Sequence, residues 1–139
     1  MMLGSLLPII FLIGGIGAKT NFKVNGTFTC DYDAWCFFVT LWEEDTSESW
    51  NDVIDRMGTK CVFGRHSYNY QLDGTEYEDG PFGDEFYEIF LTVRHNCTSY
   101  GKRELRRETT FESVKTPVVY ITWNKQLTGD IGVLVDEFV

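Results

Sequence analysis

Alternating apolar and polar residues recur in short runs along most of the chain. In the first run, Phe22, Val24, Phe28 and Cys30 share one parity, and the residues between them are mostly polar. Later runs with the same period lie at 37–42, 59–63, 68–72, 87–97, 118–123 and 131–135. A period of two is typical of strands with one buried face, and turn-forming residues separate these runs. The pattern therefore predicts an all-β chain, folded as an antiparallel sandwich of about seven to eight strands in two sheets.

Two segments depart from this simple pattern. In the acidic stretch Thr46–Gly58, four apolar residues have a spacing that predicts one short helical turn or an ordered loop. The stretch Arg103–Glu112 is rich in charge, and we interpret it as a strand whose apolar face rests on Leu105 and Phe111.

The first 18 residues carry no charge and contain an apolar run from Leu6 to Ile16. Small residues follow at Gly17 and Ala18. These features predict a signal peptide over 1–18, cleaved near Ala18, and one mature domain over 19–139. An uncleaved anchor is the alternative, although the run is short and rich in glycine for a membrane span.

The mature part has an even number of cysteines, namely Cys30, Cys36, Cys61 and Cys97. In a secreted chain this predicts two disulfides, with three connectivities open. A zinc site is the competing interpretation, but the cysteines do not form the closely paired units typical of zinc ligands. We therefore expect no metal and no cofactor. Asn25 and Asn96 each begin an N-glycosylation sequon.

The formal net charge of −9 opposes binding to nucleic acid or to a bare anionic membrane. Against this acidic background, Arg103, Arg106 and Arg107 form one basic cluster with Lys102. On a strand, Arg103 and Arg107 share a face and Arg106 lies on the other. We favour a solvated edge strand, and a site for anionic head groups is the alternative.

Apolar side chains lie on both faces of the second predicted strand, and Trp35, Phe38 and Trp42 are candidate contact residues. We expect Phe38 and Trp42 to be the exposed ones. Of the two histidines, His95 is expected to pack at a strand end and His66 to be solvated in a turn. No nucleophile and base are grouped in the sequence, so no catalytic residue is expected, and the acidic stretches are interpreted as solvated rather than as calcium ligands.

Five motifs in order resemble the nematode transthyretin-like proteins. They are VNGTFTC (24–30), VTLWEED (39–45), VRHNC (93–97), RETTF with YIT (107–111 and 120–122), and DIGVL (130–134). The resemblance implies a transthyretin-type sandwich. It also implies a disulfide between Cys30 and Cys97, which leaves Cys36 to pair with Cys61. The turn Asp31–Cys36 departs from the family pattern because it is short and lacks the usual glycine and proline.

The resemblance also shapes the functional expectation. It implies a secreted, non-enzymatic binding protein that acts in extracellular or cell-surface recognition and bridges a surface ligand to a receptor. The partner would be an extracellular protein or lipid, and self-association is compatible with this role. A carrier of a small apolar ligand is the first alternative. A hydrolase of the hydroxyisourate type is less favoured, because the chain ends at Asp136–Val139 without the Tyr-Arg-Gly-Ser tail of those enzymes.

Overall fold

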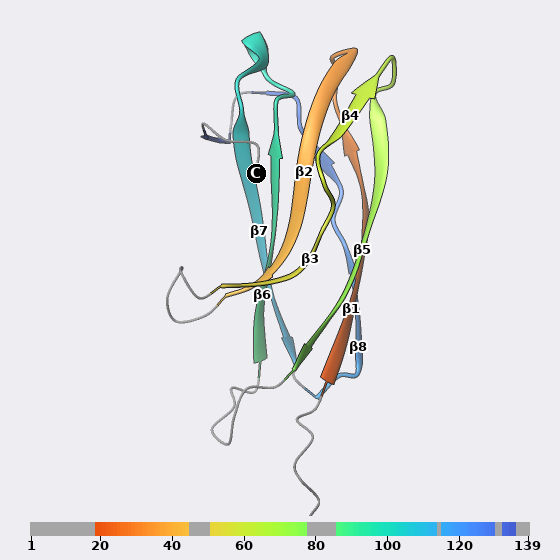
Figure 1. Cartoon of the computed structure of the whole chain (residues 1–139), viewed down its shortest axis with the longest axis vertical. Coiled ribbons are helices and arrows are strands. Elements are labelled where there is room, and N and C mark those ends of the chain that lie inside the picture. Colours follow the sequence, from red (N-terminus) through yellow and green to blue (C-terminus); the bar gives the residue numbers. More distant parts are fainter. Residues whose placement is uncertain (1–18, 45–50, 78–85, 114, 130–131, 136–139) are drawn as a thin grey trace, which may run out of the picture.

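Ten strands make up most of the described chain, which comprises residues 19–44, 51–77, 86–113, 115–129 and 132–135 of a computed structural model (Figure 1). In chain order they are β1 (Lys19–Thr29), β2 (Ala34–Glu43), β3 (Asp52–Arg56), β4 (Lys60–Phe63), β5 (Ser67–Tyr77), β6 (Phe86–His95), β7 (Glu104–Ser113), β8 (Val118–Thr122), β9 (Lys125–Gln126) and β10 (Val133–Leu134). A 3₁₀ turn, η2 (Ser99–Gly101), links β6 to β7. No helix among the described residues has the length and apolarity needed to cross a membrane. The predicted signal peptide, 1–18, lies outside the described residues.

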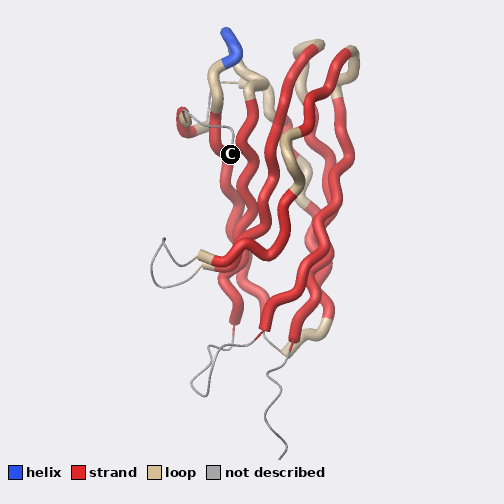
Figure 2. The backbone as a smooth tube through the Cα atoms, in the orientation of Figure 1, coloured by secondary structure: helices blue, strands red, loops and turns tan. Residues whose placement is uncertain are grey.

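The strands form two sheets that face each other across one core (Figures 1 and 2). The smaller sheet has the order β5-β1-β8, and β9 pairs with the end of β1. The larger sheet has the order β10-β7-β6-β2-β3, and β4 pairs with the start of β2. All pairs are antiparallel except β1 with β8 and β1 with β9, which are parallel. The predicted all-β fold in two largely antiparallel sheets is confirmed.

The core contains the apolar residues that share one parity on each central strand. Phe28 of β1 is its centre, because its ring stacks on Tyr70 at 4.3 Å and meets Phe37 and Trp123 edge to face. The Tyr70 hydroxyl donates to the backbone oxygen of Trp123 at 2.7 Å, and burial raises the pKa of Tyr70. Aromatic packing of this kind adds to the stability gained by removing the rings from water.

The expected helical turn or loop in Thr46–Gly58 is wrong where the chain is described, because Asp52–Arg56 is strand β3. It pairs with the second half of β2, with Thr40 opposite Arg56. A register shift between Leu41 and Trp42 interrupts this pairing. Such a bulge inserts one extra residue and so breaks the regular period of two. The apolar residues then have a spacing that resembles that of a helix. Residues 46–50 lie outside the described residues.

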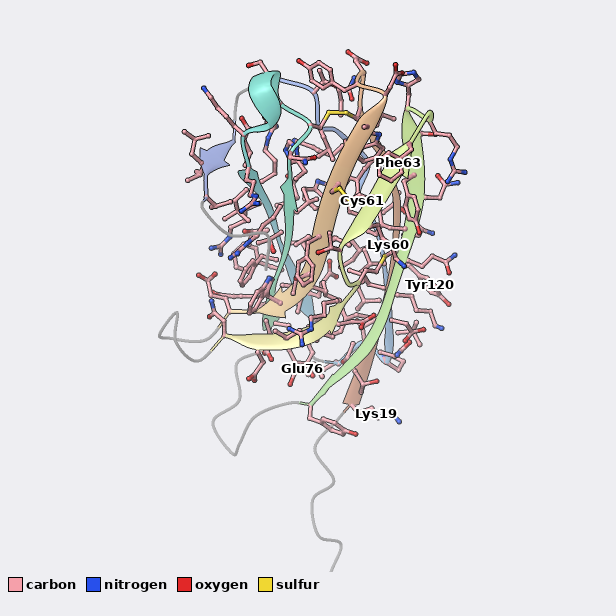
Figure 3. All side chains as sticks on the ribbon, turned by 45° about the horizontal axis from the view of Figure 1, so that its top comes forward. Lys19, Lys60, Cys61, Phe63, Glu76 and Tyr120 are labelled. Atoms are coloured by element: carbon pink, nitrogen blue, oxygen red, sulfur yellow. A yellow bond between two sulfur atoms is a disulfide. The ribbon has the colours of Figure 1, made fainter. Side chains whose placement is uncertain are left out.

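Two disulfides join Cys30 to Cys97 and Cys36 to Cys61, which are the two expected pairs. The Cys30–Cys97 bond is fully buried and links the end of β1 to the segment that follows β6. The Cys36–Cys61 bond joins directly opposed residues of β2 and β4. There Cys61, which is labelled in Figure 3, is exposed. Cys36 is half-buried. The two bonds therefore differ in their access to solvent.

Candidate recognition surface

The outward face of the larger sheet carries aromatic side chains in contact across strands. Trp42 of β2 lies opposite Phe90 of β6, and their nearly parallel rings have centroids 5.7 Å apart. The indole N–H of Trp42 donates to the hydroxyl of Thr92 at 2.9 Å. This contact fixes the Trp42 ring along the sheet, where it stays half-buried.

Arg107 of β7 covers Phe90, one member of this aromatic pair. Its guanidinium carbon lies 4.0 Å from the centre of the Phe90 ring, and its Nη2 lies 3.0 Å from Oε2 of Glu44. Both members of this ion pair are partly exposed, so the pair contributes under about 1 kcal/mol to stability. Phe90 is consequently buried although it points away from the core.

More exposed aromatics lie elsewhere on the same side of the larger sheet. Phe111 of β7 is 65% exposed and Phe63 of β4 is 73% exposed, while Phe38 of β2 is half-buried. The strand registers place all of them on the outward side of the larger sheet. We call this set the aromatic–arginine face, and it comprises Phe38, Trp42, Phe63, Phe90, Phe111 and Arg107.

The outward face of the smaller sheet is different, because polar side chains bond one another across its strands. Thr27 donates to Asn69 at 2.7 Å, and Lys23 forms an exposed ion pair with Asp73 at 3.0 Å. The Asp73 carboxylate raises the pKa of Lys23 through a hydrogen bond and its charge. Two exposed aromatic residues lie on this polar face, namely Tyr77 of β5, which is 52% exposed, and Tyr120 of β8, which is 78% exposed (Figure 3).

Two of the six candidate contact residues are buried, which corrects the sequence prediction. Trp35 lies in the core against Phe37, and its indole N–H donates to the backbone oxygen of Arg65 at 3.0 Å. Arg106 is only 8% exposed. The basic cluster is therefore split, with Arg103 and Arg107 exposed and Arg106 turned inward.

Strand β7 has the opposite orientation to the predicted one. Leu105 and Phe111 lie on its outward side, and Glu104 and Arg106 point into the sandwich. Both of these charged side chains are buried beside His95, which lies opposite Glu104 on β6. Charged residues are rarely buried unless they are paired, and nothing in the local pattern of β7 indicates such a pairing.

His95, Glu104 and Arg106 form a buried cluster of ionisable side chains. Oε2 of Glu104 lies 3.5 Å from Nε2 of His95 and 3.7 Å from Nε of Arg106. The backbone N–H of Cys97 donates to Nδ1 of His95 at 3.0 Å, so the neutral imidazole carries its proton on Nε2. Burial, and then the charge of Arg106, lower the pKa of His95 to about 4.

The two sequon asparagines have different surroundings. Asn25 lies exposed on the polar face, where its Oδ1 accepts from the hydroxyl of Thr122 at 2.9 Å. Asn96 is half-buried, and its Oδ1 accepts from the backbone N–H of Cys36 at 2.7 Å. Asn96 therefore has a structural role that Asn25 lacks.

Two other features could hold small groups. A hollow of about 580 Å³ is lined mainly by polar residues, namely Asn25, Gly26, Thr27, Met57, Tyr68, Asn69, Tyr70, Gln71 and Asn124. Carboxylate oxygens of Glu43, Asp52 and Glu76 all lie within 4.8 Å of one another at the surface. Exposed acidic groups commonly gather without an ion, so we assign no metal site to these three carboxylates.

A protein-family model matches residues 25–128, and its family is described as "Caenorhabditis elegans protein of unknown function (DUF870)". The match covers most of the chain. The protein belongs to this family.

This result overturns the transthyretin-like resemblance, although the nematode origin of the family fits that expectation. Where the chain is described, the five short motifs fall on β-strands and their turns, where similar patterns arise in many sandwiches for reasons of packing alone. No curated protein matches the chain.

Proposed function

We propose that this DUF870 protein is a secreted, non-enzymatic recognition protein that binds an extracellular or cell-surface protein through its aromatic–arginine face. One observation carries the proposal. The larger sheet turns several aromatic side chains outward, among which Phe90 contacts both Trp42 and Arg107, whereas the smaller sheet turns a largely hydrogen-bonded polar face outward. Large apolar groups gathered on one face often mark an interaction site.

The chemistry of the face suits a protein partner. Tryptophan, phenylalanine and arginine are enriched at protein interfaces, and a few such residues usually dominate the binding energy. Trp42 and Phe38 offer apolar area on a rigid sheet. Arg107 can exchange its exposed pairing with Glu44 for a carboxylate of the partner. The preferred partner surface is therefore apolar with acidic groups at its rim.

An extracellular setting fits the covalent structure. Two disulfides in one small domain are typical of proteins that mature in an oxidising compartment. The uncharged apolar segment 1–18 is the predicted signal peptide, which would direct the chain into that compartment. Neither feature depends on the family resemblance that the DUF870 match overturned.

The earlier alternatives have less support. The hollow of about 580 Å³ is large enough for a small ligand, but its polar lining does not favour an apolar one. The receptor-bridging and hydrolase roles were implied only by the transthyretin-like resemblance. We therefore propose neither.

The test is binding of the mature secreted protein to intact nematode cells and extracellular matrix, followed by chemical cross-linking. We expect Phe38→Ser and Trp42→Ser each to weaken saturable binding by about tenfold, because they remove apolar contact area. Tyr120→Ser is the matched control, since Tyr120 is an exposed aromatic residue on the polar face. Equal binding by all three variants and the wild type would refute the proposal, provided that thermal unfolding shows the variants to be folded.

A further inference from the structure

Within the part of the chain that the structure describes, strand β7 has a long edge that no other strand covers. It pairs with β6 along its whole length, from Glu104 to Ser113, but with β10 only at Glu104 and Leu105. Among the described strands, none pairs with the other side of β7 beyond this point. In Figure 1, β7 forms one side of the larger sheet.

The backbone groups at this edge can be assigned by position. The N–H of Val135 donates to the oxygen of Arg103 at 3.1 Å, on the side of β7 away from β6. Backbone groups of a strand point alternately to its two sides, so odd-numbered residues of β7 direct their N–H and C=O toward the edge. Arg107, Thr109 and Phe111 therefore present hydrogen-bonding groups that can extend the sheet.

A buried side chain next to the edge also lacks acceptors. Arg106 is more than nine-tenths buried, yet its Nε and Nη2 have no hydrogen-bond partner among the described residues. Glu104 is its nearest carboxylate, at 3.7 Å, which is too long for a hydrogen bond. A buried guanidinium without acceptors is costly, so a carboxylate supplied across the edge would stabilise it.

We propose that residues 106–112 of β7 pair antiparallel with the same residues of a second copy of this chain, with Thr109 opposite Thr109, because β10 already occupies the edge at Glu104 and Leu105. In this register Arg106 lies opposite Glu112 of the second copy, and Arg107 lies opposite Phe111 of the second copy. Each contact occurs twice because of the twofold symmetry. Glu112 is half-buried, and one of its oxygens already accepts from the Thr110 hydroxyl, which leaves the other for Arg106.

Charge selects this register over its neighbours. The inward side chains of one copy lie beside the inward side chains of the other only if odd-numbered residues pair with odd-numbered residues. The neighbouring registers that meet this condition are centred on residue 108 or on residue 110. The register centred on residue 108 places Glu108 opposite Glu108 of the second copy. The register centred on residue 110 places Glu108 opposite Glu112 of the second copy. Like charges directly opposed are destabilising, whereas the Thr109-centred register opposes arginine to glutamate and leaves Glu108 opposite Thr110.

Charged edge residues usually discourage strand pairing, so this self-complementary pattern is the feature that favours a dimer. The contact is small, and each copy carries a formal net charge of −9, so the dimer should be weak and depend on concentration. The twofold axis is perpendicular to the sheet. Both aromatic–arginine faces would lie on the same side and could bind a surface bivalently.

The experiment is sedimentation equilibrium of the mature secreted protein over a wide concentration range. The wild type should change from the mass of one copy to that of two. Thr109→Pro should remain a single copy, because it removes an edge N–H that β6 does not use. Glu112→Lys should weaken the dimer by at least about tenfold, because it opposes a positive charge to Arg106 twice.

Two sets of controls separate the possible failures. Asp33→Lys makes the same change in charge at an exposed turn and should dimerise like the wild type. Phe38→Ser and Trp42→Ser lie off β7 and should also dimerise, so loss of the dimer and loss of recognition are distinguishable. A wild type that stays a single copy at the highest concentration overturns the proposal. Undiminished dimerisation of Glu112→Lys, or of folded Thr109→Pro, also overturns it.

Discussion

The imidazole of His95 lies 3.5 Å from the carboxylate of Glu104, and both side chains are buried where β6 meets β7. Arg106 completes the cluster and is the second charged group that faces the imidazole. The imidazole of His95 is therefore a titratable group in the core, and its protonation is linked to folding.

Stability should fall as the pH drops from about 6.5 to about 4. The imidazole takes up a proton near pH 6.5 in the unfolded chain, but only near pH 4 in the folded protein. Between these values the unfolded state binds more protons, so the free energy of unfolding decreases by up to about 3 kcal/mol. Urea denaturation across this range measures the loss.

The matched variants for this prediction are His95→Asn and His66→Asn. Asparagine at 95 keeps an acceptor for the N–H of Cys97 but does not titrate, so the acid-linked loss should shrink. His66 is exposed, and its replacement should leave the loss unchanged. A pH dependence that is the same with and without His95 would exclude this group as its cause.

The Cys36–Cys61 disulfide should be reduced before Cys30–Cys97. Exchange requires a thiolate to reach a sulfur atom, and Cys61 is exposed whereas Cys30 and Cys97 are fully buried. Brief treatment with a mild reductant, alkylation and peptide mapping should label Cys36 and Cys61 first. In denaturant this order should largely disappear, and early labelling of Cys30 in native protein would contradict the burial argument.

Much of the fold could be predicted because the central strands bury only one face. Phe22, Val24 and Phe28 repeat with a period of two on β1, and Ile89, Leu91 and Val93 do the same on β6. Strand β3 could not be recognised. Its two apolar residues, Val53 and Ile54, lie at a bulge, and its stability comes from pairing with β2 rather than from its own pattern.

The candidate surface was partly predictable for the same reason. Phe38 and Trp42 were expected to be exposed; both lie on the outward side of the larger sheet, where they are half-buried. The sequence does not show that Trp35 and Arg106 are buried. Strand β2 is apolar on both faces and β7 carries charge on both faces, so neither pattern tells the inward side from the outward side. The orientation of β7 depends on the buried pairing of Glu104 with His95 and Arg106, which comes from residues on two strands.

Gly26→Ala should destabilise the protein by about 2 kcal/mol or more through overpacking. A Cβ atom at this position would overlap the backbone oxygen of Trp123, which also accepts the hydrogen bond from Tyr70. Backbone atoms cannot move aside as a flexible side chain can. Gly58→Ala is the control, because its Cβ would meet nothing within 4 Å. Chemical denaturation of both variants measures the difference, and equal stabilities would contradict the close approach.

The last prediction concerns the two sequons. Asn96→Gln should lower the free energy of unfolding by about 1–3 kcal/mol, because it displaces the oxygen that accepts from the N–H of Cys36. Asn25→Gln makes the same chemical change on the exposed polar face, where water can replace the bond from Thr122. Its effect should stay within about 0.5 kcal/mol. Both should be measured on enzymatically deglycosylated protein, so that the loss of a glycan is not mistaken for the loss of a hydrogen bond. If Asn25→Gln proves the more damaging change, the structural role assigned to Asn96 is wrong.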